Sequence, residues 1–209
     1  MKSLKSNILL MFLLALPVIL FSQDEGMVKK DSVRKLISDK PNPSGLFLSA
    51  GLGADIPFSD FADNSTTALC LGARLEYSGL KIYPFVIGLS YQYQSNEGSD
   101  DFKTTNLLNG LKTTIHSFGF GFDVILNKYL KSSFTIPFLT LEVKYLMAQR
   151  EINPENALPD LAREESVIGF SGSLGFTLYV FDIYGTYTHA KNYSSFAVKT
   201  RFRIPVLRF

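Results

Sequence analysis

The chain contains two histidines, His116 and His189, and these are the first candidates for catalysis. A hydrolase built on the wall of a sheet needs a histidine and a serine on the same face of a strand, two residues apart, with a carboxylate to orient the imidazole. The residue two after His116 is Phe118, and the residue two after His189 is Lys191. Because the spacing fails for both histidines, we predict no catalytic residues.

Metal and cofactor chemistry also lack the residues that they need. Cys70 is the single cysteine, which excludes an internal disulfide and a cysteine-built zinc site in a monomer. The acids in residues 95–101 lack the spacing of a calcium loop. Gly119 and Gly121 resemble part of a nucleotide-binding loop, but they lie in an alternating segment with no helix after it. We therefore predict no metal site and no cofactor.

Ten ionisable residues lie on the polar faces of alternating segments and form the largest candidate site. The acids are Asp55, Glu76, Asp123, Glu142 and Asp182, and the bases are Arg74, Lys144, Lys199, Arg201 and Arg203. Since the acids and bases balance, we interpret them as a paired, hydrogen-bonded charge network that fills the lumen of a barrel. An ion path lined by the same residues is the alternative.

The elements that must position these residues follow a period of two from Gly45 to the C-terminus, which is typical of strands with one apolar and one polar face. The eight apolar faces run from Leu46 to Ile56, Leu69 to Tyr77, Tyr83 to Tyr93, His116 to Leu126, Leu139 to Met147, Ile168 to Leu178, Phe181 to Tyr187 and Phe196 to Ile204. No acid, lysine or arginine lies on them. The opposite faces are rich in glycine and serine beside the ten charges.

Alternation alone also fits a soluble sandwich or a lipocalin-like barrel whose apolar side is buried. Glycine and paired charge fit the crowded lumen of a small barrel better than they fit a solvated surface. The connections also alternate in expected length. Long polar stretches fall at about residues 57–67, 95–113 and 150–166, and short ones near Gly79, residues 127–132 and Tyr179. We therefore predict an all-β fold, an eight-stranded antiparallel up-and-down transmembrane β-barrel over residues 45–209 with a side-chain-filled interior.

Aromatic residues are expected at both rims of this barrel, where amphipathic rings lie at the level of lipid headgroups. Tyr91, Tyr93, Tyr145 and Tyr187 would mark the external rim, and Tyr77, Tyr83, Tyr129 and Phe134 the periplasmic rim. The two histidines fall at the external ends of strands, where the same explanation accounts for them.

The N-terminus predicts secretion. Lys2 and Lys5 precede an apolar run from Ile8 to Phe21 that is too short to cross a bilayer as a helix, so residues 1–22 are interpreted as a signal peptide cleaved after Ser22. Residues 23–44 are polar and end in a proline-rich stretch, and we expect a periplasmic N-terminal segment outside the main fold.

Charge and composition limit the partners. The chain has 21 basic and 19 acidic residues, and loss of Lys2 and Lys5 with the signal peptide leaves 19 of each. This balance gives no support for nucleic acid binding. Charged residues are only 19% of the chain and aromatic residues 13%, a composition that favours a membrane protein.

The region from Gly45 to Phe209 resembles the small eight-stranded outer membrane barrels of the OmpA, OmpX and OmpW type, and it looks most like the PorT-like barrel families of Bacteroidota. The resemblance rests on the alternation and on the terminal aromatic Phe209, which in such barrels belongs to the signal for insertion. Alternation up to Ile204 puts Phe209 on the opposite face, so a bulge or strand end near Pro205 must shift the register. The resemblance implies the outer membrane of a Gram-negative bacterium after signal peptide cleavage.

Three functions follow from this resemblance. The leading hypothesis is a non-enzymatic outer membrane barrel, structural or an accessory subunit of an outer membrane assembly. Its expected partners are outer membrane lipid, the barrel insertion machinery and other outer membrane proteins. The alternative is a narrow channel or a passage for small hydrophobic compounds, as in OmpW-like barrels, and a lipid-modifying enzyme is the third hypothesis.

Overall fold

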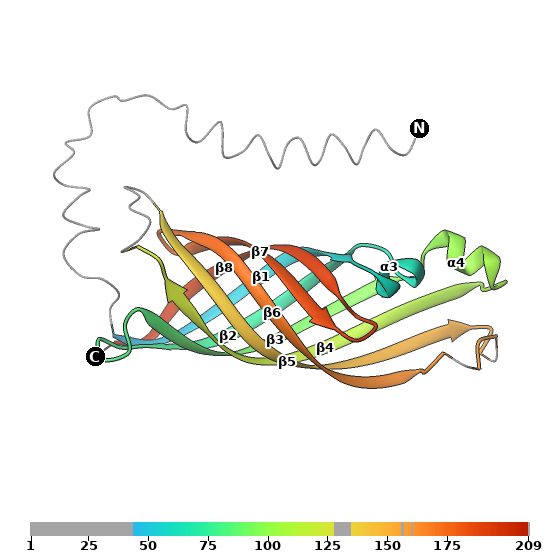
Figure 1. Cartoon of the computed structure of the whole chain (residues 1–209), viewed down its shortest axis with the longest axis horizontal. Coiled ribbons are helices and arrows are strands. Elements are labelled where there is room, and N and C mark those ends of the chain that lie inside the picture. Colours follow the sequence, from blue (N-terminus) through green and yellow to red (C-terminus); the bar gives the residue numbers. More distant parts are fainter. Residues whose placement is uncertain (1–43, 128–134, 156, 160, 209) are drawn as a thin grey trace, which may run out of the picture. The chain divides into compact units, whose positions relative to one another are not determined.

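In the computed structural model, which describes residues 44–127, 135–155, 157–159 and 161–208, eight strands close into one antiparallel barrel. The strands are β1 (Gly45–Pro57), β2 (Ala68–Ser78), β3 (Phe85–Glu97), β4 (Gly110–Ile125), β5 (Ile136–Asn153), β6 (Glu164–Leu178), β7 (Phe181–Ala190) and β8 (Ser195–Arg208), with two short helices, α3 (Asp60–Asn64) and α4 (Asp100–Thr105) (Figure 1). Each strand pairs with its neighbours in chain order, and β8 pairs with β1. The predicted eight-stranded up-and-down barrel is confirmed, whereas residues 1–43, which hold the predicted signal peptide and most of the N-terminal segment, lie outside the described residues.

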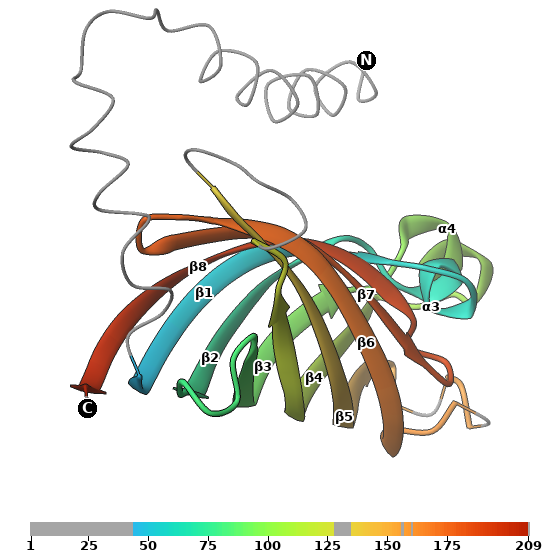
Figure 2. The ribbon, with the colours of Figure 1, turned by 60° about the vertical axis from the view of Figure 1, so that its left-hand side comes forward.

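The period of two sorts side chains between the wall and the lumen, the space that the strands enclose. Leu52, Leu71 and Phe120 are more than half exposed on the outer face, while Ser49 and Glu76 are buried on the inner face. Closure satisfies the backbone groups of both outermost strands, because β1 and β8 bond to each other along almost their whole length. Figure 2 shows the strands crossing the barrel obliquely, as closure requires.

The two ends of the barrel differ. The loop end carries the connections 58–67, 98–109, 154–163 and 191–194, including α3 and α4, and the turn end carries the connections 79–84, 126–135 and 179–180 (Figure 1). Gly45 pairs with Arg208, so the described part of the chain starts and finishes at the turn end. Of the predicted rim tyrosines, Tyr187 pairs with Phe196 next to the loop end and Tyr77 lies one residue before β2 ends. Tyr91 and Tyr145 instead lie near the middle of β3 and β5.

The predicted lengths of two connections were wrong. The connection between β4 and β5 spans 126–135 and is as long as the one between β5 and β6, which spans 154–163. Pro137, the second residue of β5, has no N–H to donate to β4, and the pairing of β5 with β4 begins at the next residue, Phe138. At the other end, β5 continues to Asn153 and pairs with Gly110, which shortens the loop. Tyr129 and Phe134, expected at the rim, lie outside the described residues.

The last strand contains the register shift predicted near Pro205. Phe47 pairs with Pro205 and the preceding Leu46 pairs with Leu207, so Val206 is an extra residue in β8. The bulge moves Leu207 to the outer face, where it is largely exposed. Phe209 itself lies outside the described residues.

Neither helix of the described part of the chain has the length and apolar character that a bilayer-spanning helix requires.

Candidate functional site: the charged lumen

The inner faces of six strands bring the ten ionisable residues into the lumen. Asp55 comes from β1, Arg74 and Glu76 from β2, Asp123 from β4, Glu142 and Lys144 from β5, Asp182 from β7, and Lys199, Arg201 and Arg203 from β8. Nine of these side chains are buried or nearly so, and Arg203 is partly exposed at the turn end. A side chain at every second residue of a strand points inward, so strand geometry alone gathers them.

Arg201 is the centre of the charge network. Its Nη1 lies 2.9 Å from Glu76 Oε1, its Nη2 3.1 Å from Asp123 Oδ2, and its Nε 2.5 Å from Asp182 Oδ2. Arg203 adds a second guanidinium, with Nε 2.7 Å from Glu76 Oε2 and Nη2 3.1 Å from Asp182 Oδ2. Charge-assisted contacts of this length compensate carboxylates that have lost their water.

Arg74 extends the network toward β5. Its Nη1 donates to Asp123 Oδ1 at 2.7 Å, and its Nε lies 3.9 Å from Glu76 Oε1 and 3.8 Å from Glu142 Oε1. Lys144 Nζ then lies 3.7 Å from Glu142 Oε2. Four bases and four acids are therefore linked through contacts of 4.0 Å or less.

Asp55 and Lys199 are not part of this linked group. Lys199 Nζ donates to Gln92 Oε1 at 2.5 Å, and Asp55 accepts from Ser195 Oγ at 3.0 Å and Gln94 Nε2 at 3.4 Å. Within the described residues neither side chain has an ion pair within 4.0 Å. The structure therefore brings eight of the ten predicted residues into one network and leaves these two outside it.

Two aromatic residues that sequence reasoning did not single out pack against the network. The Arg201 guanidinium carbon lies 5.3 Å from the centroid of the Phe138 ring and 5.4 Å from that of Tyr184, a distance at which cation–π attraction operates. Tyr184 has the same parity as Asp182 and Phe138 the same parity as Thr140, so the period of two could have placed both in the lumen.

An apolar layer closes the lumen at the loop end. Its members are Phe61, Ile115, Leu146, Ala148, Ala190 and Tyr193. Phe61 comes from α3 and meets Tyr193 edge-on with ring centroids 5.5 Å apart, while the Arg150 guanidinium carbon lies 5.0 Å from the centroid of the Tyr193 ring. The Tyr193 hydroxyl donates to Glu165 Oε2 at 2.8 Å. Burial raises the pKa of Tyr193 well above its usual range, against the opposing effect of Arg150, so the phenol stays neutral.

Apolar side chains also line the lumen at the turn end. Phe47, Val86, Ile125 and Phe138 are buried on the inner face of their strands. They form part of the wall of a cavity of about 230 Å³ that also touches Glu76, Asp123 and Arg203. The charge network therefore lies between two apolar zones.

Each histidine has a hydroxyl group as its partner. His116 Nδ1 lies 2.8 Å from the hydroxyl of Tyr91 on the outer face. His189 Nδ1 lies 3.3 Å from Ser194 Oγ, a contact across the β7–β8 connection that a search for pairs two residues apart could not find. Ser194 is nearly buried and its hydroxyl is 3.0 Å from the carbonyl of Ala190, to which it donates. Neither imidazole has a carboxylate partner among the residues that the structure describes.

Among the described residues, no group of three or more histidine, cysteine, aspartate or glutamate side chains is arranged to hold a metal ion.

Comparison with known proteins adds the fold and little else. No protein-family model and no curated protein matches the sequence. Among solved structures, Neisserial surface protein A (NspA) is similar with a TM-score of 0.55 and 14% identity, over 79% of this chain and 99% of that one. Ail of Yersinia pestis follows at 0.48 and 11%, over 78% and 100% of the two chains, and the N-terminal β-barrel domain of Pseudomonas aeruginosa OprF at 0.40 and 10%, over 78% and 100%. The likeness to NspA shows a small outer membrane barrel fold, and the two lower scores carry no argument.

Proposed function

We propose that this chain is a non-enzymatic outer membrane β-barrel that serves as a structural element or an accessory subunit of an outer membrane assembly. The single observation that carries the proposal is a complete apolar wall around a lumen filled by its own side chains. Leu52, Leu71, Phe120, Phe170 and Leu174 are each more than half exposed on that wall. A soluble protein does not expose a continuous apolar surface of this kind, whereas lipid solvates it.

The charge network supports a structural role for the lumen. Arg201 is only 5% exposed and contacts three carboxylates, so the network holds β2, β4, β7 and β8 together through one side chain. Such a network resists deformation of the barrel, because separation of any pair leaves a charge buried without its partner. We propose that the ten lumenal residues act as this rigid plug and not as an ion path.

The orientation follows from the two ends of the barrel. Small outer membrane barrels have short periplasmic turns and longer external loops, so we assign the turn end to the periplasm and the loop end to the exterior. The polar segment 23–44 then lies on the periplasmic side, after removal of residues 1–22. The proposal includes Phe209 as the insertion signal read by the barrel insertion machinery, within the PorT-like type that the sequence resembles.

Fractionation and electrophoresis test the location. Mature protein should fractionate with outer membranes, and purified protein in detergent should migrate differently when boiled and unboiled, because a closed barrel stays folded in the unboiled sample. Protein found in the aqueous periplasmic extract, or identical mobility together with helical circular dichroism, would contradict the proposal. A protein that copurifies reproducibly after mild detergent extraction would identify the assembly.

A passage for small hydrophobic compounds keeps one supporting observation, the 230 Å³ cavity at the turn end with Phe47, Val86 and Ile125 in its wall. The loop-end layer opposes it, because Phe61 and Tyr193 close the path beyond. Planar bilayer recordings together with uptake of a hydrophobic dye into proteoliposomes separate the two functions. Uptake that depends on the protein would favour the passage.

A further inference from the structure

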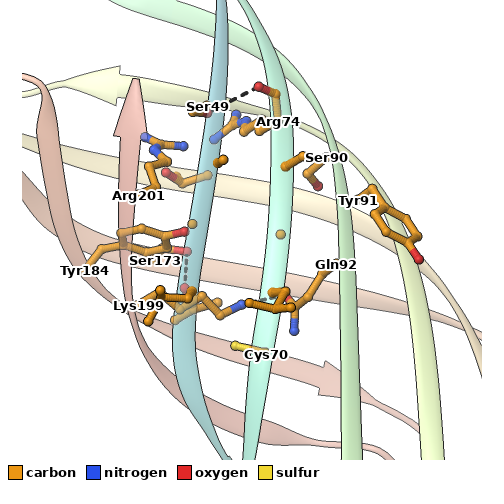
Figure 3. A pocket seen from close by; sticks show the side chains of 18 of the residues that line it. Ser49, Cys70, Arg74, Ser90, Tyr91, Gln92, Ser173, Tyr184, Lys199 and Arg201 are labelled. Atoms are coloured by element: carbon orange, nitrogen blue, oxygen red, sulfur yellow. Dashed lines mark hydrogen bonds between the residues drawn. The ribbon is translucent and has the colours of Figure 1, made fainter. Parts of the chain in front are cut away.

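A second cavity, of about 60 Å³, lies in the middle of the lumen and is lined by residues from seven strands. Its wall carries four bases, Arg74, Lys144, Lys199 and Arg201, and one acid, Glu142. Figure 3 shows Lys199, Arg201 and Arg74 around this space, with Tyr184 and Ser173 on one side of it and Cys70 and Gln92 on the other. The other acids of the predicted network do not line the cavity, so bases outnumber acids on its wall, although Arg74 and Arg201 also contact carboxylates behind it.

Several donors on this wall lack an acceptor. Arg74 Nε and Nη2 are buried and have no hydrogen-bond partner among the described residues. The whole residue is only 7% exposed, so bulk solvent does not supply one. Lys144 Nζ lies 3.7 Å from Glu142 Oε2, longer than a hydrogen bond, and Lys199 Nζ donates to the neutral amide oxygen of Gln92. A buried N–H group of a cation that has no acceptor destabilises the folded protein, so these donors favour the binding of an acceptor.

Nearby carboxylates do not supply this acceptor. Asp55 hydrogen bonds to Ser195 and Gln94, and it does not line the cavity. Asp123 and Asp182 are taken up by the guanidinium groups of Arg74, Arg201 and Arg203. Glu142 is the one carboxylate on the cavity wall, and its Oε2 lies 3.7 Å from Lys144 Nζ, beyond hydrogen-bond distance. The unused donors of Arg74 and Lys144 can therefore bind an acceptor from outside the chain.

We infer that the cavity binds one small inorganic anion of the halide type, held by the ammonium groups of Lys144 and Lys199 with the free N–H groups of Arg74 nearby. The size fits, because about 10–15 Å³ of such volume is enough for one water molecule, and the cavity therefore has room for a halide ion. The hydroxyls of Ser173, Thr186 and Tyr184 on the same wall supply further donors. The bound anion would neutralise part of the positive charge and complete the rigid plug proposed above, on whose lumenal arrangement this inference rests.

Bromide serves as the probe. The protein is refolded from urea into detergent micelles in sodium bromide, desalted into sodium gluconate, and its retained bromide is counted by mass spectrometry. We expect about one bromide per chain, released only on boiling, because the flanking apolar zones slow exchange. Absence of retained bromide in the folded wild-type protein would overturn the inference and leave a water-filled cavity, while the mobility shift on boiling would still report the barrel.

Variants locate the bound ion. K144M/K199M should retain less than a tenth of the wild-type bromide, and the matched control K191M, which removes an exposed lysine of the β7–β8 connection, should retain all of it. Equal retention by K144M/K199M and wild type would overturn the inference. If the double variant fails to fold, anomalous diffraction from wild-type crystals grown in bromide decides. A peak between Lys144 and Lys199 supports the site, and peaks only on the surface refute it.

Discussion

At the scale of single residues, the lumen depends on charges that cannot be removed one at a time. Arg201 neutralises the negative charges of Glu76, Asp123 and Asp182 together. Without it, Arg74 and Arg203 would neutralise only part of this charge. Loss of one partner of a buried pair is far more costly than loss of a surface pair, because the remaining charge stays buried.

We therefore expect Arg201→Met to lower the free energy of unfolding by about 3–5 kcal/mol. The control Arg163→Met removes the exposed partner of Glu155 and should change it by less than about 1 kcal/mol. Urea unfolding of both variants in the same detergent or lipid, monitored by far-ultraviolet circular dichroism, measures the difference in free energy of unfolding. Equal effects of the two substitutions would show that the network contributes no special stability.

Glycine is required where the backbone of one strand lies against a large lumenal side chain. A Cβ at Gly53 would lie 2.5 Å from the carbonyl oxygen of Val198 and 2.6 Å from Cγ of Lys199. Gly53→Ala should therefore destabilise the barrel by about 1–3 kcal/mol. Gly172→Ala on the outer face is the control, since its Cβ would meet only Leu141 Cδ2 at 3.9 Å. Similar unfolding midpoints for the two variants would contradict this account.

The period of two could place residues in the lumen but could not pair them. It puts Asp55 and Lys199 on inner faces together with the other eight charges, yet these two make no ion pair within the described residues. Which side chains meet depends on the stagger between strands, which sets the height of each residue in the barrel. The contact of His189 with Ser194 could not be predicted either, because it depends on the path of a four-residue connection.

At the scale of elements, each strand presents one face to lipid and the opposite face to the lumen. Replacement of Leu71 or Phe120 with arginine should cost about 2–4 kcal/mol, because the charge would lie in hydrocarbon. Ser173→Thr on the inner face keeps the hydroxyl that contacts Thr186 at 2.8 Å and should cost less than about 1 kcal/mol. Unfolding from lipid vesicles gives the order of the three variants. The reverse order would mean that the faces are exchanged.

The sequence predicts which segments form strands, and which face of each strand points outward, better than it predicts where the strands end. The alternation from Leu46 to Ile56 predicts β1, and the parity conflict between Ile204 and Phe209 predicts a register shift near Pro205, which the structure places at Val206. The ends of β5 were missed because pairing with β4 continues to Asn153, beyond the alternating apolar run. The end of a strand depends on hydrogen bonds to the neighbouring strand, and the residue pattern of one segment holds no information about them.

At the scale of the whole molecule, the lumen is obstructed at more than one level. The loop-end layer with Phe61 and Tyr193 lies on one side of the charge network, and Arg201 blocks the middle. We expect no conductance steps in planar bilayers from the wild-type protein, and none from F61S/Y193S either, because the network still fills the barrel. An open porin inserted in the same bilayers is the positive control. Steps from the wild-type protein would support a channel.

The final strand supplies Lys199, Arg201 and Arg203, whereas all five lumenal acids lie on earlier strands. Of the ten charges of the predicted network, a sheet that lacks β8 would keep five acids, Asp55, Glu76, Asp123, Glu142 and Asp182, and two bases, Arg74 and Lys144. Mutual repulsion of these carboxylates would oppose closure of the sheet. When β8 pairs with β1, its three bases neutralise this excess of negative charge. We therefore expect a polypeptide that lacks β8 to form no closed barrel.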